Sequence, residues 1–109
     1  MLESLFGSRT AEKVLLYLQN YEEGYGKAIA DANAIPLNAV QNQLRKLEEG
    51  GVIVSQLKGR TRMYSWNPRY PFLKSLRALL EQAFEFIPEK EIKAIYRKRV
   101  RPRRAGKPM

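Results

Sequence analysis

Three side-chain amides, those of Asn38, Gln41 and Asn42, occur at spacings that place them on one face of a helix. An amide both donates and accepts hydrogen bonds, so an Asn or Gln side chain can pair in bidentate fashion with the edge of an adenine. Arg45 follows one turn later, where a guanidinium can reach a phosphate or a guanine. By periodicity alone the same face is an ordinary solvated surface, so the hypothesis of base contact depends on the elements around it.

Lys58, Arg60 and Arg62 form a second group of candidates, close together around a glycine. Such cations suit phosphate or minor-groove contact, although charges at a hairpin edge also protect against aggregation. The chain has no cysteine and no histidine, which excludes disulfides, thiolate metal sites and the commonest general base. Its Ser, Tyr, Lys and acidic residues form no recognisable catalytic constellation. We therefore expect no enzyme, no metal site and no cofactor.

Pro36 divides residues 27–49 into two helices, because proline is disfavoured inside a helix but favoured at its first turn. The first is expected over about 27–34 and the second over 37–49. In the second, Val40, Leu44 and Leu47 recur at i, i+4 and i+7 and face the core, which leaves the amide face outward.

Beyond two glycines the hydrophobic period changes from near four to near two, which predicts a β-hairpin over 52–66 with a basic tip. The alternate spacing of Tyr64 and Trp66 favours core packing over base stacking. Upstream, the pattern predicts a helix over about 10–20, a short helix before it and a brief strand at Tyr25.

A last long helix is expected over 72–86, with two apolar stripes. One stripe suffices to dock the helix on its own domain, so the second implies a partner, most simply a second copy of the chain. The alternative is a helix buried on two sides of the monomer. The residues expected at a homodimer interface are Leu73, Leu76, Leu79, Leu80, Ala83, Phe86 and Ile87.

The formal charge of the 109-residue chain is +9. Most of this positive charge lies in residues 88–109, which hold nine basic and two acidic side chains. We expect this basic tail to be partly disordered, from about Val100, because it has too few apolar groups to join a core. A membrane-surface role is weaker, since the segment has no apolar face. Expected phosphate contacts in the tail are Arg97, Lys98, Arg99, Arg101, Arg103 and Arg104.

The order of these elements is that of a winged helix-turn-helix, a mainly α fold with a small β-hairpin (α+β). Residues 29–53, with Leu47-Glu48-Glu49-Gly50 leading into apolar residues, resemble ArsR- and MarR-like transcriptional regulators. The Leu5-Phe6-Gly7-Ser8 opening and the Gly59-Arg60 turn are similar to small winged-helix regulators associated with nucleotidyltransferases. The resemblance covers about residues 5–87. It implies a DNA-binding domain over 1–87, with a dimerisation segment at 72–87.

We therefore expect a homodimeric, sequence-specific regulator that binds double-stranded DNA, with helix 37–49 in the major groove and wing 57–62 on the backbone or minor groove. Alternatives are an antitoxin-like module that holds a partner enzyme such as a nucleotidyltransferase, and an RNA-binding winged helix. The absence of a secretory n-region and of any apolar run near the roughly 20 residues of a membrane span predicts a cytoplasmic protein without membrane contact. The expected DNA-binding residues are Pro36, Leu37, Asn38, Gln41, Asn42, Arg45, Lys46, Lys58, Arg60 and Arg62.

Overall fold

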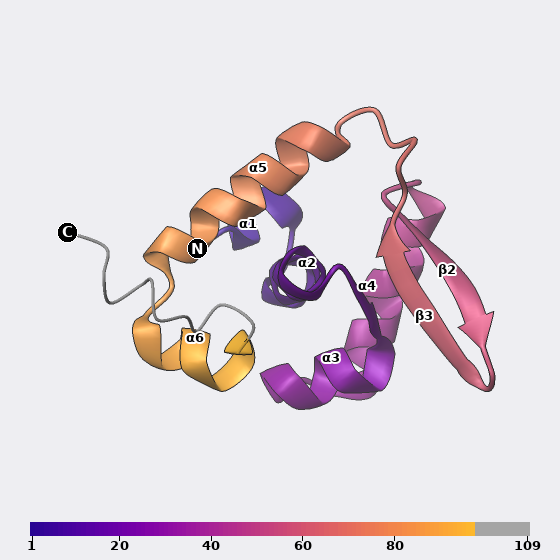
Figure 1. The fold of residues 1–109 in the computed structure, drawn as a ribbon, viewed down its shortest axis with the longest axis horizontal. Helices are drawn as coiled ribbons and strands as arrows, with labels where there is room; N and C mark the ends of the chain where they lie inside the picture. Colours follow the sequence, from indigo (N-terminus) through magenta and orange to yellow (C-terminus); the bar gives the residue numbers. More distant parts are fainter. Residues whose placement is uncertain (98–109) are drawn as a thin grey trace.

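A computed structural model describes residues 1–97 of the chain, and residues 98–109 lie outside the described part. Figure 1 shows helix α2 at the centre, with α5 along one side, α3 and α4 along another, and the sheet beyond α4. The elements in chain order are α1 (Glu3–Phe6), α2 (Arg9–Tyr21), β1 (Glu23–Tyr25), α3 (Gly26–Asn33), α4 (Leu37–Glu49), β2 (Ile53–Lys58), β3 (Thr61–Trp66), α5 (Leu73–Ala83), the 3₁₀ helix η1 (Phe84–Phe86) and α6 (Glu89–Ile95).

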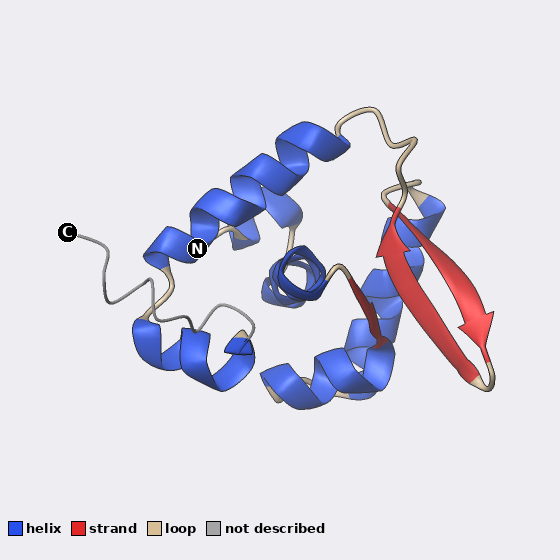
Figure 2. Cartoon of the chain, in the orientation of Figure 1, coloured by secondary structure: helices blue, strands red, loops and turns tan. Residues whose placement is uncertain are grey.

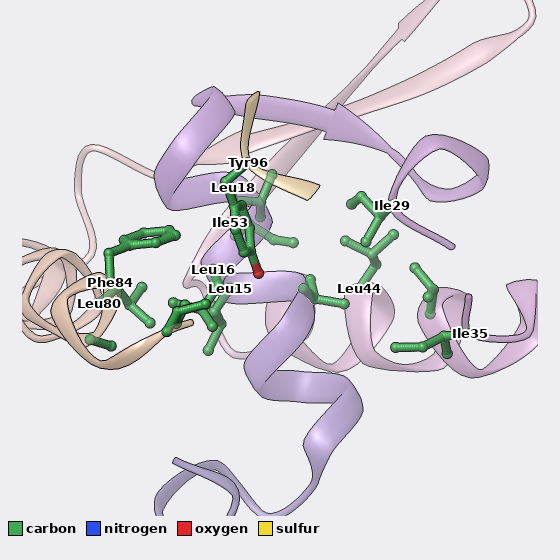
Figure 3. Packing of buried hydrophobic residues seen from close by; sticks show 14 of the residues in the cluster. Leu15, Leu16, Leu18, Ile29, Ile35, Leu44, Ile53, Leu80, Phe84 and Tyr96 are labelled. Atoms are coloured by element: carbon green, nitrogen blue, oxygen red, sulfur yellow. The ribbon is translucent and has the colours of Figure 1, made fainter. Parts of the chain in front are cut away.

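Helix α2 supplies the middle of the hydrophobic core. The Oγ of Ser8 accepts a hydrogen bond from the Ala11 N–H at 3.0 Å and so caps the start of α2. The carboxylate of Glu12 is buried and accepts the Leu2 N–H at 2.8 Å, which holds the N-terminal segment with α1 over α2. Four aliphatic side chains of α2 are fully or almost fully buried: Val14, Leu15, Leu16 and Leu18. Figure 3 labels the three leucines within the core.

Helices α3 and α4 form the helix-turn-helix, and their boundary is set by two residues. Ala34 ends α3 in the left-handed region with φ of 55°, and the N–H of Ile35 returns to the Ala30 carbonyl at 3.0 Å. Pro36, with φ of −56°, then precedes the first residue of α4. The predicted bounds of α4 are confirmed to the residue, and Val40 and Leu44 point inward with no exposed surface.

The wing is a hairpin of β2 and β3 to which β1 adds a third antiparallel strand, in the order β1-β3-β2 (Figure 2). Gly59 has φ of 65° at the tip, a conformation that glycine adopts without strain. Gly24 of β1 pairs with Tyr64, and a Cβ on this glycine would stand 2.7 Å from the Tyr17 ring. The strand can therefore pass directly over α2 only because residue 24 lacks a side chain.

The hydrophobic core extends past α5. The single helix predicted over 72–86 is α5 followed by one 3₁₀ turn, and the core continues with Ile92 of α6 and with Tyr96, the residue that follows α6. The Phe84 and Tyr96 rings pack edge to face, with their centres 4.9 Å apart. The division between domain and tail expected at residue 87 stays a prediction, and the core cluster of the structure includes Ile92 of α6 and Tyr96 directly after it.

Polar contacts fix both C-terminal helices on α2. The Tyr21 hydroxyl donates to the Ile95 carbonyl at 2.6 Å, and Lys13 forms an ion pair with Glu91 at 2.8 Å. On α5, the Arg77 guanidinium lies 5.4 Å from the centre of the Trp66 ring. It also donates hydrogen bonds to Gln19 of α2 and to Glu22, the residue that caps the end of α2. Among residues 1–97, no helix has the length and apolar character needed to cross a membrane.

The core role of α6 can be tested by stability. Replacing Ile92 with Ala should lower the free energy of unfolding by about 2–5 kcal/mol, since it removes a fully buried side chain. Lys93→Ala, an exposed change on the same helix, should shift it by less than about 0.5 kcal/mol. Denaturant titration followed by circular dichroism measures both. A chain ended after Ile87 that unfolds with the stability of the full chain would contradict the assignment of α6 to the core.

Candidate nucleic-acid interface

The outer face of α4 carries five polar or basic side chains, all exposed: Asn38, Gln41, Asn42, Arg45 and Lys46. Val40 and Leu44 are fully buried on the opposite face. Within residues 1–97, none of the five outward side chains is engaged in a hydrogen bond or ion pair. The structure thus brings all of the α4 candidates to one open surface, as predicted.

The start of α4 is open as well. Pro36 is exposed and provides no side-chain cap, and Leu37 retains 40% of its surface. Because the first N–H groups of a helix have no intrahelical partner and carry partial positive charge, this end is favourable for anions.

A groove of about 370 Å³ lies between the start of α4 and the wing, and we call it the wing groove. Two tyrosines and three cations are prominent in its lining. The residues are Tyr25, Gly26, Lys27, Leu37, Gln41, Leu44, Arg60, Thr61, Arg62 and Tyr64. The sequence interpretation did not include Tyr25 and Lys27 among the candidate residues, although a tyrosine and a lysine at the start of the helix-turn-helix were visible in the sequence.

The three wing cations differ in their surroundings. Lys58 lies 3.7 Å from the Glu23 carboxylate of β1. The Arg62 guanidinium donates to the Ser55 Oγ at 3.0 Å, and this hydroxyl in turn donates to Glu48 at 2.7 Å. Arg60 alone of the three has no ion pair or side-chain hydrogen bond within the described part of the chain.

The aromatic residues of β3 belong to the core side, as predicted. Trp66 is buried beneath Arg77, and Tyr64 is half-buried against the hydrophobic cluster. Burial raises the pKa of the Tyr64 phenol, the Glu48 carboxylate raises it further, and Arg62 acts in the opposite direction. The phenol therefore stays neutral beside the groove at physiological pH.

The residues expected at a dimer interface divide into three groups. Leu80, Ala83 and Ile87 are buried in the core of their own chain, so they are removed from the interface set, because one chain already covers them. Leu73 and Leu76 are partly buried against that core. Phe86 is 69% exposed and lines, with Leu79, an apolar groove of about 350 Å³ between α5 and the N-terminal residues Met1 and Leu2.

Of the tail candidates, Arg97 is exposed and its backbone N–H donates to the Tyr21 hydroxyl at 3.2 Å. The others, Lys98, Arg99, Arg101, Arg103 and Arg104, lie outside the described residues. Among the residues that are described, no group of three or more acidic side chains is gathered in a way that could hold a metal ion.

No protein-family model matches the sequence, and no curated protein does. Three solved structures resemble the chain. YusO from Bacillus subtilis is 20% identical with a TM-score of 0.56, over 85% of this chain and 74% of that one. A ZitR variant from Lactococcus lactis in its apo form is 19% identical with a TM-score of 0.55, over 88% and 81%.

The adhesin competence repressor AdcR from Streptococcus pyogenes is 14% identical with a TM-score of 0.52, over 84% of this chain and 78% of that one. These likenesses agree with the observed order of a helix-turn-helix followed by a hairpin wing and a long helix. The sequence resemblance to winged-helix regulators is thereby confirmed at the level of the fold. The chain has the winged helix-turn-helix fold.

Proposed function

We propose that the protein is a sequence-specific transcriptional regulator that binds double-stranded DNA. The observation that carries this proposal is the outer face of α4, five exposed polar or basic side chains without a partner among residues 1–97. In a helix-turn-helix the second helix enters the major groove, and its N-terminal residues meet the base edges. One of the structural neighbours is named as a repressor. The proposal includes no catalytic role and no cofactor.

Within this proposal, each part of the interface has a separate task. Asn38, Gln41 and Asn42 read bases, and Arg45 and Lys46 bind phosphate beside them. The wing lies on the DNA backbone or in the minor groove. Arg60 is free to bind there, whereas Lys58 and Arg62 must first give up their contacts with Glu23 and Ser55. The tail from Arg97 adds electrostatic affinity without sequence preference.

The proposal also includes a homodimer, formed across the apolar groove beside α5. A second copy suits this surface because Phe86, which lines the groove, keeps 69% of its area exposed, and exposed apolar patches mark interaction sites. Two-fold symmetry would place two α4 helices on successive turns of a pseudo-palindromic site. A partner enzyme on the same face, or RNA in place of DNA, would appear as other outcomes of the tests below.

The assignment of the amides is tested by selecting bound sequences from random duplexes. Asn38→Ala, Gln41→Ala and Asn42→Ala should each relax preference at one or two base positions, because each loses roughly 1–3 kcal/mol of bidentate discrimination. Gln56→Ala, an exposed amide on β2 outside the wing groove, is the matched control and should leave the motif unchanged. If all three α4 variants select the wild-type motif, α4 does not read the bases. Duplex RNA as competitor tests the rival nucleic acid.

The role of the wing is tested by salt dependence. Arg60→Gln should weaken binding to specific and scrambled duplexes alike and reduce the log–log salt slope by about 0.9, the value for one lost phosphate contact. Lys74→Gln, an exposed cation on α5, should leave the slope unchanged. A loss restricted to one sequence would show instead that the wing reads bases, and equal slopes would show that Arg60 does not touch the duplex.

The dimer is tested by sedimentation velocity at micromolar concentration. Phe86→Lys should give a folded monomer, because this side chain is mostly exposed within its own chain and a lysine there would place a charge in the interface. Leu57→Lys, at an apolar wing position that is 60% exposed, should leave the dimer intact. Wild-type protein that sediments as a monomer would contradict this part of the proposal.

A further inference from the structure

We propose that Leu37 and Tyr25, at the wing groove, bind the 5-methyl group of a pyrimidine, so that the protein distinguishes thymine from uracil in duplex DNA. This inference rests on the proposed function and deepens it, since it assigns a base contact to apolar side chains of the interface, beside the amide of Gln41. Thymine presents the one apolar group that an unmodified base pair carries in the major groove.

Both side chains are exposed, at positions where packing of the core does not require an apolar residue. Leu37 keeps 40% of its surface and Tyr25 keeps 42%. In the described part of the chain, neither belongs to the buried hydrophobic cluster or to the half-buried side chains packed against it. About two fifths of the surface of each residue is therefore left uncovered by the monomer.

The two residues converge on one place although they come from different elements. Tyr25 ends β1, Leu37 begins α4, and both line the wing groove. The Cδ1 of Leu37 lies 3.5 Å from the position that a Cβ on Gly26 would take, and the Cγ of Gln41 lies 3.6 Å from it. Leu37 is thus directed back over the start of α3 and rests beside the stem of Gln41.

This arrangement sets an apolar contact next to a hydrogen-bonding one. Leu37 and Gln41 are four residues apart, so they are neighbours on one helix face. An amide that pairs with an adenine would place the Leu37 methyl groups over the adjoining base step, at the depth of a thymine methyl. The first turn of the second helix is also the part of this motif that reaches base edges.

The test compares the selected duplex with duplexes in which deoxyuridine replaces thymine one position at a time. Removing a methyl group from an apolar contact should weaken wild-type binding about fourfold, which corresponds to about 0.8 kcal/mol, at one or two positions. Leu37→Ala should bind the thymine and uracil duplexes equally. Leu37→Met, which keeps an apolar side chain of similar reach, should retain the preference. Tyr25→Ala should reduce it.

Val54→Ala is the matched control, because Val54 has the same exposed fraction of 40% but lies on β2 outside the wing groove. It should keep the wild-type preference for thymine. Circular dichroism melts of all variants establish that each is folded, as expected for exposed positions.

The outcomes separate this inference from the proposed function. A protein that selects a DNA sequence but binds every uracil duplex like its thymine counterpart overturns the inference and leaves the function standing. Leu37→Ala that weakens both duplexes by the same factor also overturns it, since the side chain would then act only through the shape of α4. A protein that selects no duplex sequence overturns both.

Discussion

The fold depends on covering helix α2. Its residues Val14, Leu15, Leu16 and Leu18 are all buried, and at 3.6 residues per turn these positions spread over roughly 200° of the helix surface. No single neighbouring helix can cover such an arc, so α2 needs α4 on one side and α5 on another, with α6 and strand β1 completing the enclosure.

The enclosure of α2 also determines what α4 can present. Because Val40 and Leu44 are fully buried, their packing fixes the rotation of α4 about its axis, and the amides on the other side can only point outward. The hairpin is fixed relative to the same core by Ile53 and Trp66. The polar face of α4 and the wing are therefore held in place by buried core residues, which do not contact a ligand themselves.

Two surfaces of opposite chemistry remain after the core is complete. One is polar and basic, over α4 and the wing, and the other is apolar, beside α5 and the N-terminal residues. The Arg77 guanidinium connects the two sides of the molecule, since it reaches from α5 to α2 and lies over Trp66 of β3.

The sequence by itself determined the local structure and the composition of the α4 surface. Pro36 marked the division between α3 and α4, Gly59 marked the turn of the wing, and hydrophobic spacing identified which face of α4 is buried, because these signals act within a few residues. The basic character of the wing was equally visible in the charge pattern.

Only the tertiary structure decided which apolar residues are buried in the core of their own chain. Leu80 and Ile87 matched an interface stripe by periodicity but are buried by their own domain, and Tyr96 lies in a basic segment yet has no exposed surface. Periodicity reports that a side chain is apolar and on which face it lies, but not which partner covers that face. Tertiary packing, which no local sequence pattern encodes, also decided three contacts between elements. These are the contacts of Lys58 with Glu23, of Arg62 with Ser55, and of Leu37 with the start of α3 at Gly26.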